Sequence, residues 1–168
     1  GLPLRIDGRT YNGSCVIHNK EILGITLKQN LPNDGVQYEP RWFTPWQAGK
    51  VITLTRQGVT FQAGDLIYES NGIRFGIEIC EDLWVAIPPS SYLSLMGAHI
   101  IGNLSASNEL VSKMDYRKSL ISNQSARTMC SYIYSSAGVH ESTTDVLFSG
   151  HLLISENGSL LKENNRFQ

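Results

Sequence analysis

The segment from Ile73 to Cys80 limits most strongly what this chain can fold into. Its residues, Ile-Arg-Phe-Gly-Ile-Glu-Ile-Cys, alternate between apolar side chains and small, polar or charged ones. This period of two predicts an extended strand whose apolar face packs on a core. The thiol of Cys80 then emerges on the polar face, where Glu81-Asp82 turns the chain. A thiol in that position is available to a substrate, so the segment predicts both a sheet and a candidate nucleophile.

Other strand-like segments outnumber the helical ones. They cover residues 11–18, 21–28, 51–55, 59–61, 65–69, 98–104, 131–137, 145–148, 151–155 and 160–162. Asn19-Lys20, Asn71-Gly72 and Asn157-Gly158 have the composition of tight turns between them. The order is a hairpin, then βαβαβ, then a meander. It predicts a single α/β domain over residues 1–168, with a sheet covered by helices on one side.

Two helices are predicted between these strands. A short one over 91–96 follows Pro88-Pro89-Ser90 and takes a serine as its N-cap. A long one over 112–130 places Met114, Ile121, Ala126 and Met129 on one face. Residues 36–50 combine two prolines with several aromatic side chains and predict an ordered loop instead of a helix.

Composition and charge exclude several classes of function. The net charge of -1 and the 41% hydrophobic content indicate a globular protein with no nucleic-acid or membrane partner. No apolar run of about 18 residues is present. Three widely spaced cysteines, at 15, 80 and 130, do not form a disulfide framework and favour a cytoplasmic location. No CxxC or HxxxH pattern occurs, so no metal site is predicted.

A cysteine nucleophile needs a group that favours the thiolate and donors that hold an oxyanion. Lys28, at the polar end of the strand over 21–28, is a candidate for both tasks, and the backbone amide of Glu81 is a second donor. No histidine is obviously placed as a base, so a carboxylate is the natural choice, and Glu39 follows Lys28 by eleven residues, across the loop. Taken singly, each residue has a structural explanation: Cys80 as core, Lys28 as a solvated charge, and Glu81-Asp82 as a turn.

Several short segments follow one another along the chain in a characteristic order. They are Lys28 with Leu31-Pro32-Asn33, Tyr38-Glu39 with Arg41-Trp42-Phe43, Cys80-Glu81-Asp82-Leu83-Trp84, Asn103-Leu104-Ser105-Ala106-Ser107, Glu141-Ser142-Thr143-Thr144-Asp145 and Glu156-Asn157-Gly158. This series resembles the nitrilase superfamily of carbon–nitrogen hydrolases. The Cys-Glu-Asp-x-Trp and Glu-Ser-Thr-Thr-Asp segments narrow the resemblance to glutaminase domains of glutamine-dependent NAD synthetases. It spans residues 2–167 and implies a partial nitrilase-like α-β-β-α sandwich, a mixed sheet covered by helices.

The resemblance implies a Glu-Lys-Cys triad. Cys80 matches its nucleophile, Lys28 its lysine, and Glu39 an additional glutamate that supports the site. The general-base glutamate of the family lies well upstream of the lysine, but only 27 residues precede Lys28 and none matches that motif. The chain is therefore expected to be a fragment of the domain, and to be inactive or nearly so by itself.

The reaction that the resemblance implies is glutamine hydrolysis through a cysteine thioester. The ammonia would pass to a separate synthetase domain, which amidates deamido-NAD to NAD. ATP, magnesium and deamido-NAD would belong to that domain, so this chain is expected to need no cofactor of its own.

Contacts to glutamine are also implied by the resemblance. Glu81 and Ser107 match residues that hold the two ends of the amino acid, Lys113 falls where a basic residue completes the contact, and Trp84 would wall the pocket. Many relatives have a tyrosine where this chain has Asp34. Either the loop is rebuilt as an Asn-Asp-Gly turn, or another residue such as Tyr38 replaces that contact.

Two other functions stay open at this point. One is a stand-alone amidase or carbamoylase of the same superfamily, which a downstream Ser-Gly-Gly-x-Asp-Ser segment would exclude. The other is a non-catalytic scaffold, which selective alkylation of Cys80 over Cys15 and Cys130 would exclude. Either the enzyme or the scaffold is expected to form a homo-oligomer.

Overall fold

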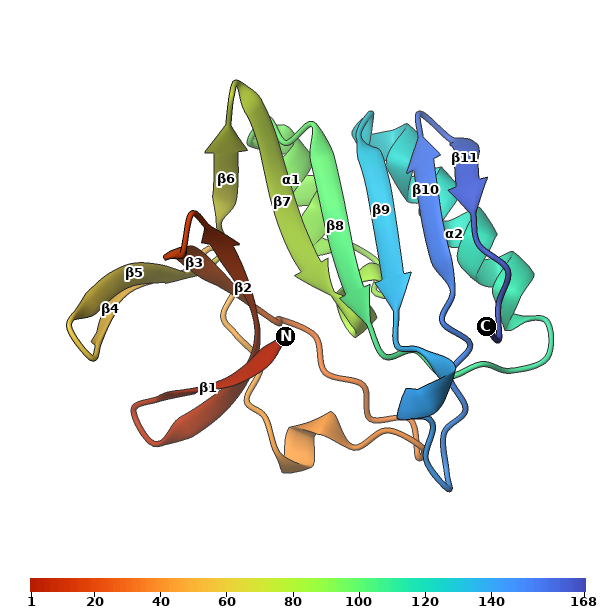
Figure 1. The fold of residues 1–168 in the computed structure, drawn as a ribbon, viewed down its shortest axis with the longest axis horizontal. Coiled ribbons are helices and arrows are strands. Elements are labelled where there is room, and N and C mark those ends of the chain that lie inside the picture. The colour runs from red at the N-terminus through yellow and green to blue at the C-terminus, as the bar shows by residue number, and fades with distance from the viewer.

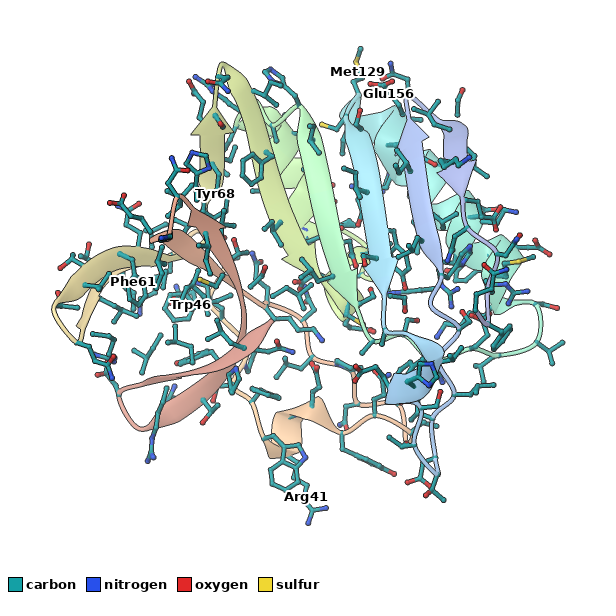
Figure 2. The ribbon with its side chains drawn as sticks, in the orientation of Figure 1. Arg41, Trp46, Phe61, Tyr68, Met129 and Glu156 are labelled. Atoms are coloured by element: carbon teal, nitrogen blue, oxygen red, sulfur yellow. The ribbon has the colours of Figure 1, made fainter.

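Eleven strands form two separate mixed sheets in the computed structural model, which describes all 168 residues (Figure 1). The first sheet contains β1 (Leu2–Ile6), β2 (Arg9–His18), β3 (Glu21–Leu27), β4 (Val51–Arg56) and β5 (Val59–Gly64). Its order is β1-β2-β3-β5-β4, and only β3 and β5 pair in parallel. The sheet curls around an apolar core that includes Trp46 and Phe61 (Figure 2).

The second sheet is larger and carries the helices. It contains β6 (Ile67–Ser70), β7 (Ile73–Ile79), β8 (Ile100–Ser105), β9 (Ser131–Ser136), β10 (Leu152–Glu156) and β11 (Ser159–Glu163). Neighbours follow the order β11-β10-β9-β8-β7-β6, and the three strands β7, β8 and β9 are parallel. Helices α1 (Pro89–Leu95) and α2 (Lys113–Thr128) cover one face of this sheet (Figure 1).

The three parallel strands end at the same edge of the sheet. In Figure 1 their arrowheads point to the lower edge, whereas Met129 and Glu156 mark the opposite edge in Figure 2. Three short 3₁₀ helices lie at the lower side, Glu39–Arg41, Cys80–Leu83 and Val139–Glu141. Polar residues that follow β3, β7 and β8 are thereby brought to one place. No helix is long and apolar enough to cross a membrane.

Tight turns fix the register of the hairpins. Both central residues have positive φ angles in the turns Asp7-Gly8, Asn19-Lys20, Gln57-Gly58, Asn71-Gly72 and Asn157-Gly158. Such turns match the twist of the strands they join, and Asn, Asp and Gly adopt them at low cost. The three turns predicted from the sequence are therefore confirmed.

Strand prediction failed at three places. β1 was not predicted, because Pro3 interrupts its pattern, but an edge strand tolerates a proline. Residues 145–148 were predicted as a strand and form none, because the Thr143 hydroxyl accepts hydrogen bonds from the amides of Asp145 and Val146 and turns the chain there. The single sheet expected from the element order is wrong as well: β3 pairs with β5, so the N-terminal strands and the β4–β5 hairpin form a sheet of their own.

The helices also differ in detail from the prediction. α1 starts at Pro89 with Pro88 as its N-cap, so a serine cap is wrong. In α2, Ile121 is buried as expected, but Ala126 is exposed and Met129, just past the helix, is 81% exposed. The face that is buried instead carries polar side chains, which bond to neighbouring elements; its members are Arg117, Ile121, Gln124 and Ser125.

The burial of the two faces of β7 differs from the prediction: Gly76 and Glu78 of the polar face are buried, whereas only Ile79 of the apolar face is. Glu78 is 1% exposed and lies under the helices, where it accepts hydrogen bonds from the Ser90 amide and the Tyr132 hydroxyl. A Cβ atom at Gly76 would lie 2.7 Å from a methyl carbon of Leu93, so glycine allows α1 to approach closely. Ile73 on the other face is 49% exposed. The polar face is therefore the one that packs on the helices.

Candidate active site

A cleft of about 940 Å³ is lined by residues of both sheets. The residues around the ends of β7, β8 and β9 form one wall, and the loop that follows β3 forms another. Lys28, Glu39 and Cys80 all line this cleft. The structure thus brings together the three residues that the resemblance implies for catalysis, although 52 positions separate Lys28 from Cys80.

The backbone presents Cys80 at a sharp turn. The residue follows β7 directly and opens the 3₁₀ helix Cys80–Leu83 with a φ angle of 50°. A left-handed conformation is unfavourable for a residue with a Cβ atom, typically by 1–3 kcal/mol, and is retained where the surroundings hold it. The side chain is 8% exposed and lines the cleft instead of continuing the alternation of β7.

Asp82 ties this turn to the residues that follow Lys28. Its Oδ1 accepts hydrogen bonds from the backbone amides of Gln29 and Asn30, at 3.2 and 2.8 Å, and from Nδ2 of Asn30 at 3.0 Å. Its Oδ2 accepts from the amide of Ile79 at 3.0 Å. A carboxylate bonded in this way at both oxygens holds the two chain segments in register. Asp82 therefore fixes where Lys28 and Cys80 lie relative to each other.

Lys28 is buried and paired. It is 1% exposed, and its Nζ donates to Oε2 of Glu39 at 2.5 Å. The other oxygen of Glu39, Oε1, accepts from Nδ2 of Asn12 at 3.1 Å. Each oxygen of Glu39 therefore accepts a hydrogen bond, one from the Lys28 ammonium and one from Asn12.

A smaller hollow of about 210 Å³ opens on another side of Cys80. It is lined by Cys80 together with charged, polar and aromatic side chains, namely Asp34, Gln37, Glu81, Trp84, Ser107, Asn108 and Lys113. Four of the five residues that the resemblance implies for substrate binding thus meet here. The fifth, Tyr38, lines only the larger cleft, and its hydroxyl donates to the carbonyl of Gly35 at 2.6 Å.

Asp34 occupies the rim of this hollow as part of a turn. Its Oδ1 accepts from the amides of Val36 and Gln37, at 3.0 and 2.8 Å. These backbone hydrogen bonds lower the pKa of Asp34, so its carboxylate is ionised. Of the two alternatives raised by the sequence, the structure therefore has the rebuilt Asn-Asp-Gly turn.

Charges of both signs face the smaller hollow. Partial burial raises the pKa of Glu81, an effect that the Lys28 ammonium opposes. Burial and the neighbouring Arg117 lower the pKa of Lys113, whose Nζ donates to Oδ1 of Asn108 at 2.5 Å and lies 5.1 Å from the centre of the Trp84 ring. Separate anionic and cationic groups beside one thiol suit a zwitterionic ligand.

Sequence reasoning missed four residues that shape the site. Asp82 was taken as a turn residue, and Asn12, Gln37 and Asn108 were not singled out. Asp82 carried a signal, because a carboxylate directly behind a candidate nucleophile can bond to backbone amides. The other three gave none, because their partners lie 27 or more positions away for Asn12 and Gln37, and Asn108 depends on the path of the loop.

The remaining cysteines and histidines lie outside both hollows. Cys130 is buried, while Cys15 is only half-buried. Burial raises the pKa of both thiols. His151 is fully buried between Arg117 and Glu163, so its role is structural.

A family model described as carbon-nitrogen hydrolase matches residues 1–168. The chain belongs to the carbon-nitrogen hydrolase family. Curated relatives of this chain include the glutamine-dependent NAD(+) synthetases of Mycobacterium tuberculosis (strain ATCC 25618 / H37Rv), 39% identical over 171 residues, and of Homo sapiens, 30% identical over 178 residues. Each alignment covers 99% of this chain but only 25% of the relative. The chain spans about a quarter of the length of these relatives.

Solved structures agree with this assignment. The carbon-nitrogen hydrolase chain superimposes on a glutamine-dependent NAD(+) synthetase from Cytophaga hutchinsonii with a TM-score of 0.90 and 35% identity, over 100% of this chain and 27% of that one. A carbon-nitrogen hydrolase from Helicobacter pylori G27 gives a TM-score of 0.75 at 18% identity, over 96% and 55% of the two chains. The second match concerns the fold alone, and together the two confirm the nitrilase-like α/β architecture.

Proposed function

We propose that this chain is the glutamine-hydrolysing part of a glutamine-dependent NAD synthetase. The observation that carries the proposal is the convergence of Lys28 and Cys80 in one cleft, with Asp82 bonded to the segments that carry both. Family membership and the similarity to NAD synthetases support the assignment of the amide as that of glutamine.

In this proposal the thiolate of Cys80 attacks the side-chain amide carbon of glutamine. A carbon–sulfur bond forms, and the carbonyl π electrons move to oxygen. Lys28 and the backbone amide of Glu81 stabilise the oxyanion. The carbon–nitrogen bond then breaks, and the leaving group takes a proton and departs as ammonia. Water hydrolyses the resulting thioester, which releases glutamate and regenerates Cys80.

The proton of Cys80 needs an acceptor. Two carboxylates line the larger cleft: Glu39, which is paired with Lys28 and also accepts a hydrogen bond from Asn12, and Glu141. Because the resemblance puts the base glutamate upstream of the lysine, we assign Glu39 to holding Lys28 and propose that the general base is a carboxylate outside residues 1–168. Amidation of deamido-NAD, with the ATP and magnesium it needs, is likewise assigned to another part of the full-length protein. A cytoplasmic location and a homo-oligomer remain predictions.

The smaller hollow beside Cys80 is proposed to receive the amino-acid end of glutamine. Glu81 would face the ammonium, while Ser107 and Lys113 would face the carboxylate, with Trp84 as the wall. Lys113 offers a single-point contact where a guanidinium would offer two, so its bond to the carboxylate depends on the position that Asn108 gives it.

Selective alkylation tests the proposal on the chain as it stands. A diazoketone analogue of glutamine is incubated with the protein, and labelling of each cysteine is followed by mass spectrometry. We expect saturable labelling of Cys80, at least about tenfold faster than that of Cys15 or Cys130. Cys15 is the more exposed residue, so accessibility alone would favour it over Cys80.

The alternatives give different results in the same experiment. A scaffold without a primed thiol would be labelled slowly and without saturation at all three cysteines. An amidase or carbamoylase would show a fast reaction of Cys80 with iodoacetamide but no saturation by the glutamine analogue, and no protection by free glutamine. Either result would overturn the assignment to glutamine.

A further inference from the structure

The loop that follows β8 supplies one side of the smaller hollow. Ser107, Asn108 and Lys113 come from this stretch and from the first residue of α2. Residues 106–112 form no helix or strand, and the exposed fraction of Val111 is 99%. Something other than regular structure must therefore hold Ser107 and Asn108 against Cys80.

Arg117 is the group that reaches this loop from beneath. It stands one turn into α2 and is fully buried. Its Nη1 donates to Oε2 of Glu109 at 3.1 Å, and its Nη2 points at the carbonyl of Asn108 at 3.5 Å. The guanidinium also lies 5.8 Å from the centre of the Tyr134 ring. A planar fork with fixed donors fits such a set of acceptors, which an ammonium could not serve together.

The partners of Arg117 are themselves held in place. Glu109 accepts from the Ser149 hydroxyl at 2.6 Å and faces Arg166 at 3.0 Å. Burial alone would raise the pKa of Glu109, but the Ser149 hydroxyl and the Arg117 guanidinium lower it overall, so this carboxyl is ionised.

His151 closes the other side of Arg117. Its Nδ1 accepts from Nη1 of Arg117 at 2.8 Å, which requires the ring proton on Nε2, where it donates to Glu163 at 3.0 Å. Burial lowers the pKa of His151, which keeps the ring neutral beside the guanidinium. Arg117 therefore has one orientation, which is set by His151 just before β10 and by Glu163 at the end of β11. The orientation of Arg117 in turn determines the position of the loop residues that it contacts.

We propose that Arg117 is a positioning residue that sets the geometry of the glutamine-binding loop, residues 106–112. This inference rests on the proposed function, because it assigns the loop to the amino-acid end of the substrate. Arg117 touches neither Cys80 nor the cleft, so its effect is on binding and not on the reactivity of the thiol.

The test compares Arg117→Met with Arg127→Met, a change of the exposed arginine on the same helix. Two labelling reactions of Cys80 are measured in each variant, one with the diazoketone analogue of glutamine and one with iodoacetamide. For Arg117→Met we expect the half-saturating concentration of the analogue to rise about tenfold, while the iodoacetamide rate stays within about twofold. Arg127→Met should change neither.

A second readout does not depend on a ligand. Hydrogen exchange of the amides in 106–112 should accelerate in Arg117→Met and stay unchanged in Arg127→Met. If the parent chain shows no saturation by the analogue, the proposed function fails and the exchange rates alone decide the role of Arg117. Equal changes in both labelling reactions, or unchanged exchange in the loop, would overturn the inference. If Arg117→Met does not fold, Glu109→Gln is judged by the same two readouts.

Discussion

At the scale of single residues, the buried ammonium of Lys28 is the feature that separates this site from a structural cysteine. It is 1% exposed, yet it faces the cleft that also holds Cys80. A buried lysine is retained where a partner compensates its desolvation, and Glu39 is that partner here. A cation held in this way favours the ionised form of a neighbouring thiol.

Replacing Lys28 by methionine tests this interaction. Methionine has a similar length and no charge, so the cleft that holds Cys80 loses a cation. We expect the rate of Cys80 alkylation by iodoacetamide at pH 7 to fall about tenfold or more. Labelling of Cys15 serves as the internal control and should not change. An unchanged rate at Cys80 would show that Lys28 does not act on the sulfur.

Glu78 gives a prediction about pH. Burial raises its pKa to about 7, against the opposing hydrogen bonds from Tyr132 and the Ser90 amide. In the unfolded chain its pKa returns to roughly 4.3. The native state therefore binds the proton more tightly, so Glu78 favours folding fully below about pH 4.3, and this contribution is lost as pH rises through about 7.

Glu78→Gln should remove most of that dependence. The free energy of unfolding at pH 5 minus that at pH 8 is expected to shrink by on the order of 2–3 kcal/mol, as measured by urea denaturation. Asp115→Asn, at an exposed carboxyl on α2, is the control and should leave the difference as it was. A difference that persists in Glu78→Gln would place the buried proton elsewhere.

At the scale of elements, the β4–β5 hairpin has two glycines that differ in how much space surrounds them. Gly64 ends β5 with a φ angle of 133°, and a Cβ atom there would lie 2.1 Å from the carbonyl oxygen of Lys50. Gly58 has a φ angle of 80° in the turn, and nothing lies within 4 Å of its Cβ position.

Alanine at these two positions should therefore have unequal effects. Gly58→Ala should lower the free energy of unfolding by about 1 kcal/mol, because only its left-handed backbone conformation is unfavourable for alanine. Gly64→Ala must in addition displace a backbone carbonyl, and we expect a loss of more than about 3 kcal/mol. Urea denaturation of both variants measures the difference, and equal losses would contradict the close approach of β5 to Lys50.

The elements also show what a sequence can and cannot predict here. The apolar alternation of β7 predicted its strand and the position of Cys80 at the strand's end. The alternation did not predict the direction of the thiol, because the left-handed backbone of Cys80 turns it into the cleft. Burial of the polar face was not predictable, because it depends on α1 packing against Gly76 and on the hydrogen bonds of Glu78. The polar buried face of α2 was missed for the same reason, since Arg117 and Gln124 find their partners in distant segments.

For the site, the resemblance predicted which residues take part, and only the fold shows where they come together. Short motifs selected Lys28, Glu39 and Cys80, and all three line the cleft. The Asp82 bonds that bring them together join residues 52 and 53 positions apart, and no periodicity carries such information. Tyr38 was placed near the substrate, but its own hydrogen bond to Gly35 keeps it in the loop.

At the scale of the whole molecule, the cleft has groups that bind and stabilise charge, but the general base is proposed to lie outside residues 1–168. We expect ammonia release from glutamine by residues 1–168 to be slower by several orders of magnitude than in an enzyme with a free general base. A coupled ammonia assay measures it, with Cys80→Ala as the background. Turnover of about 1 per second or more that depends on Cys80 would contradict the placement of the base outside this chain.

The hydrogen bonds of Asp82 have a consequence for the connectivity of the molecule. They connect Asn30 to the end of β7 through the Asp82 carboxylate. The chain between Asn30 and Asp82 is therefore a loop whose two ends are held together by hydrogen bonds. A protease that cuts the Gln57-Gly58 turn would leave two pieces, one holding the ammonium and the other the sulfur. Strand pairing and the Asp82 hydrogen bonds should let the two pieces recombine after denaturation. Fast alkylation of Cys80 would then return when both pieces are mixed, but not with either piece alone.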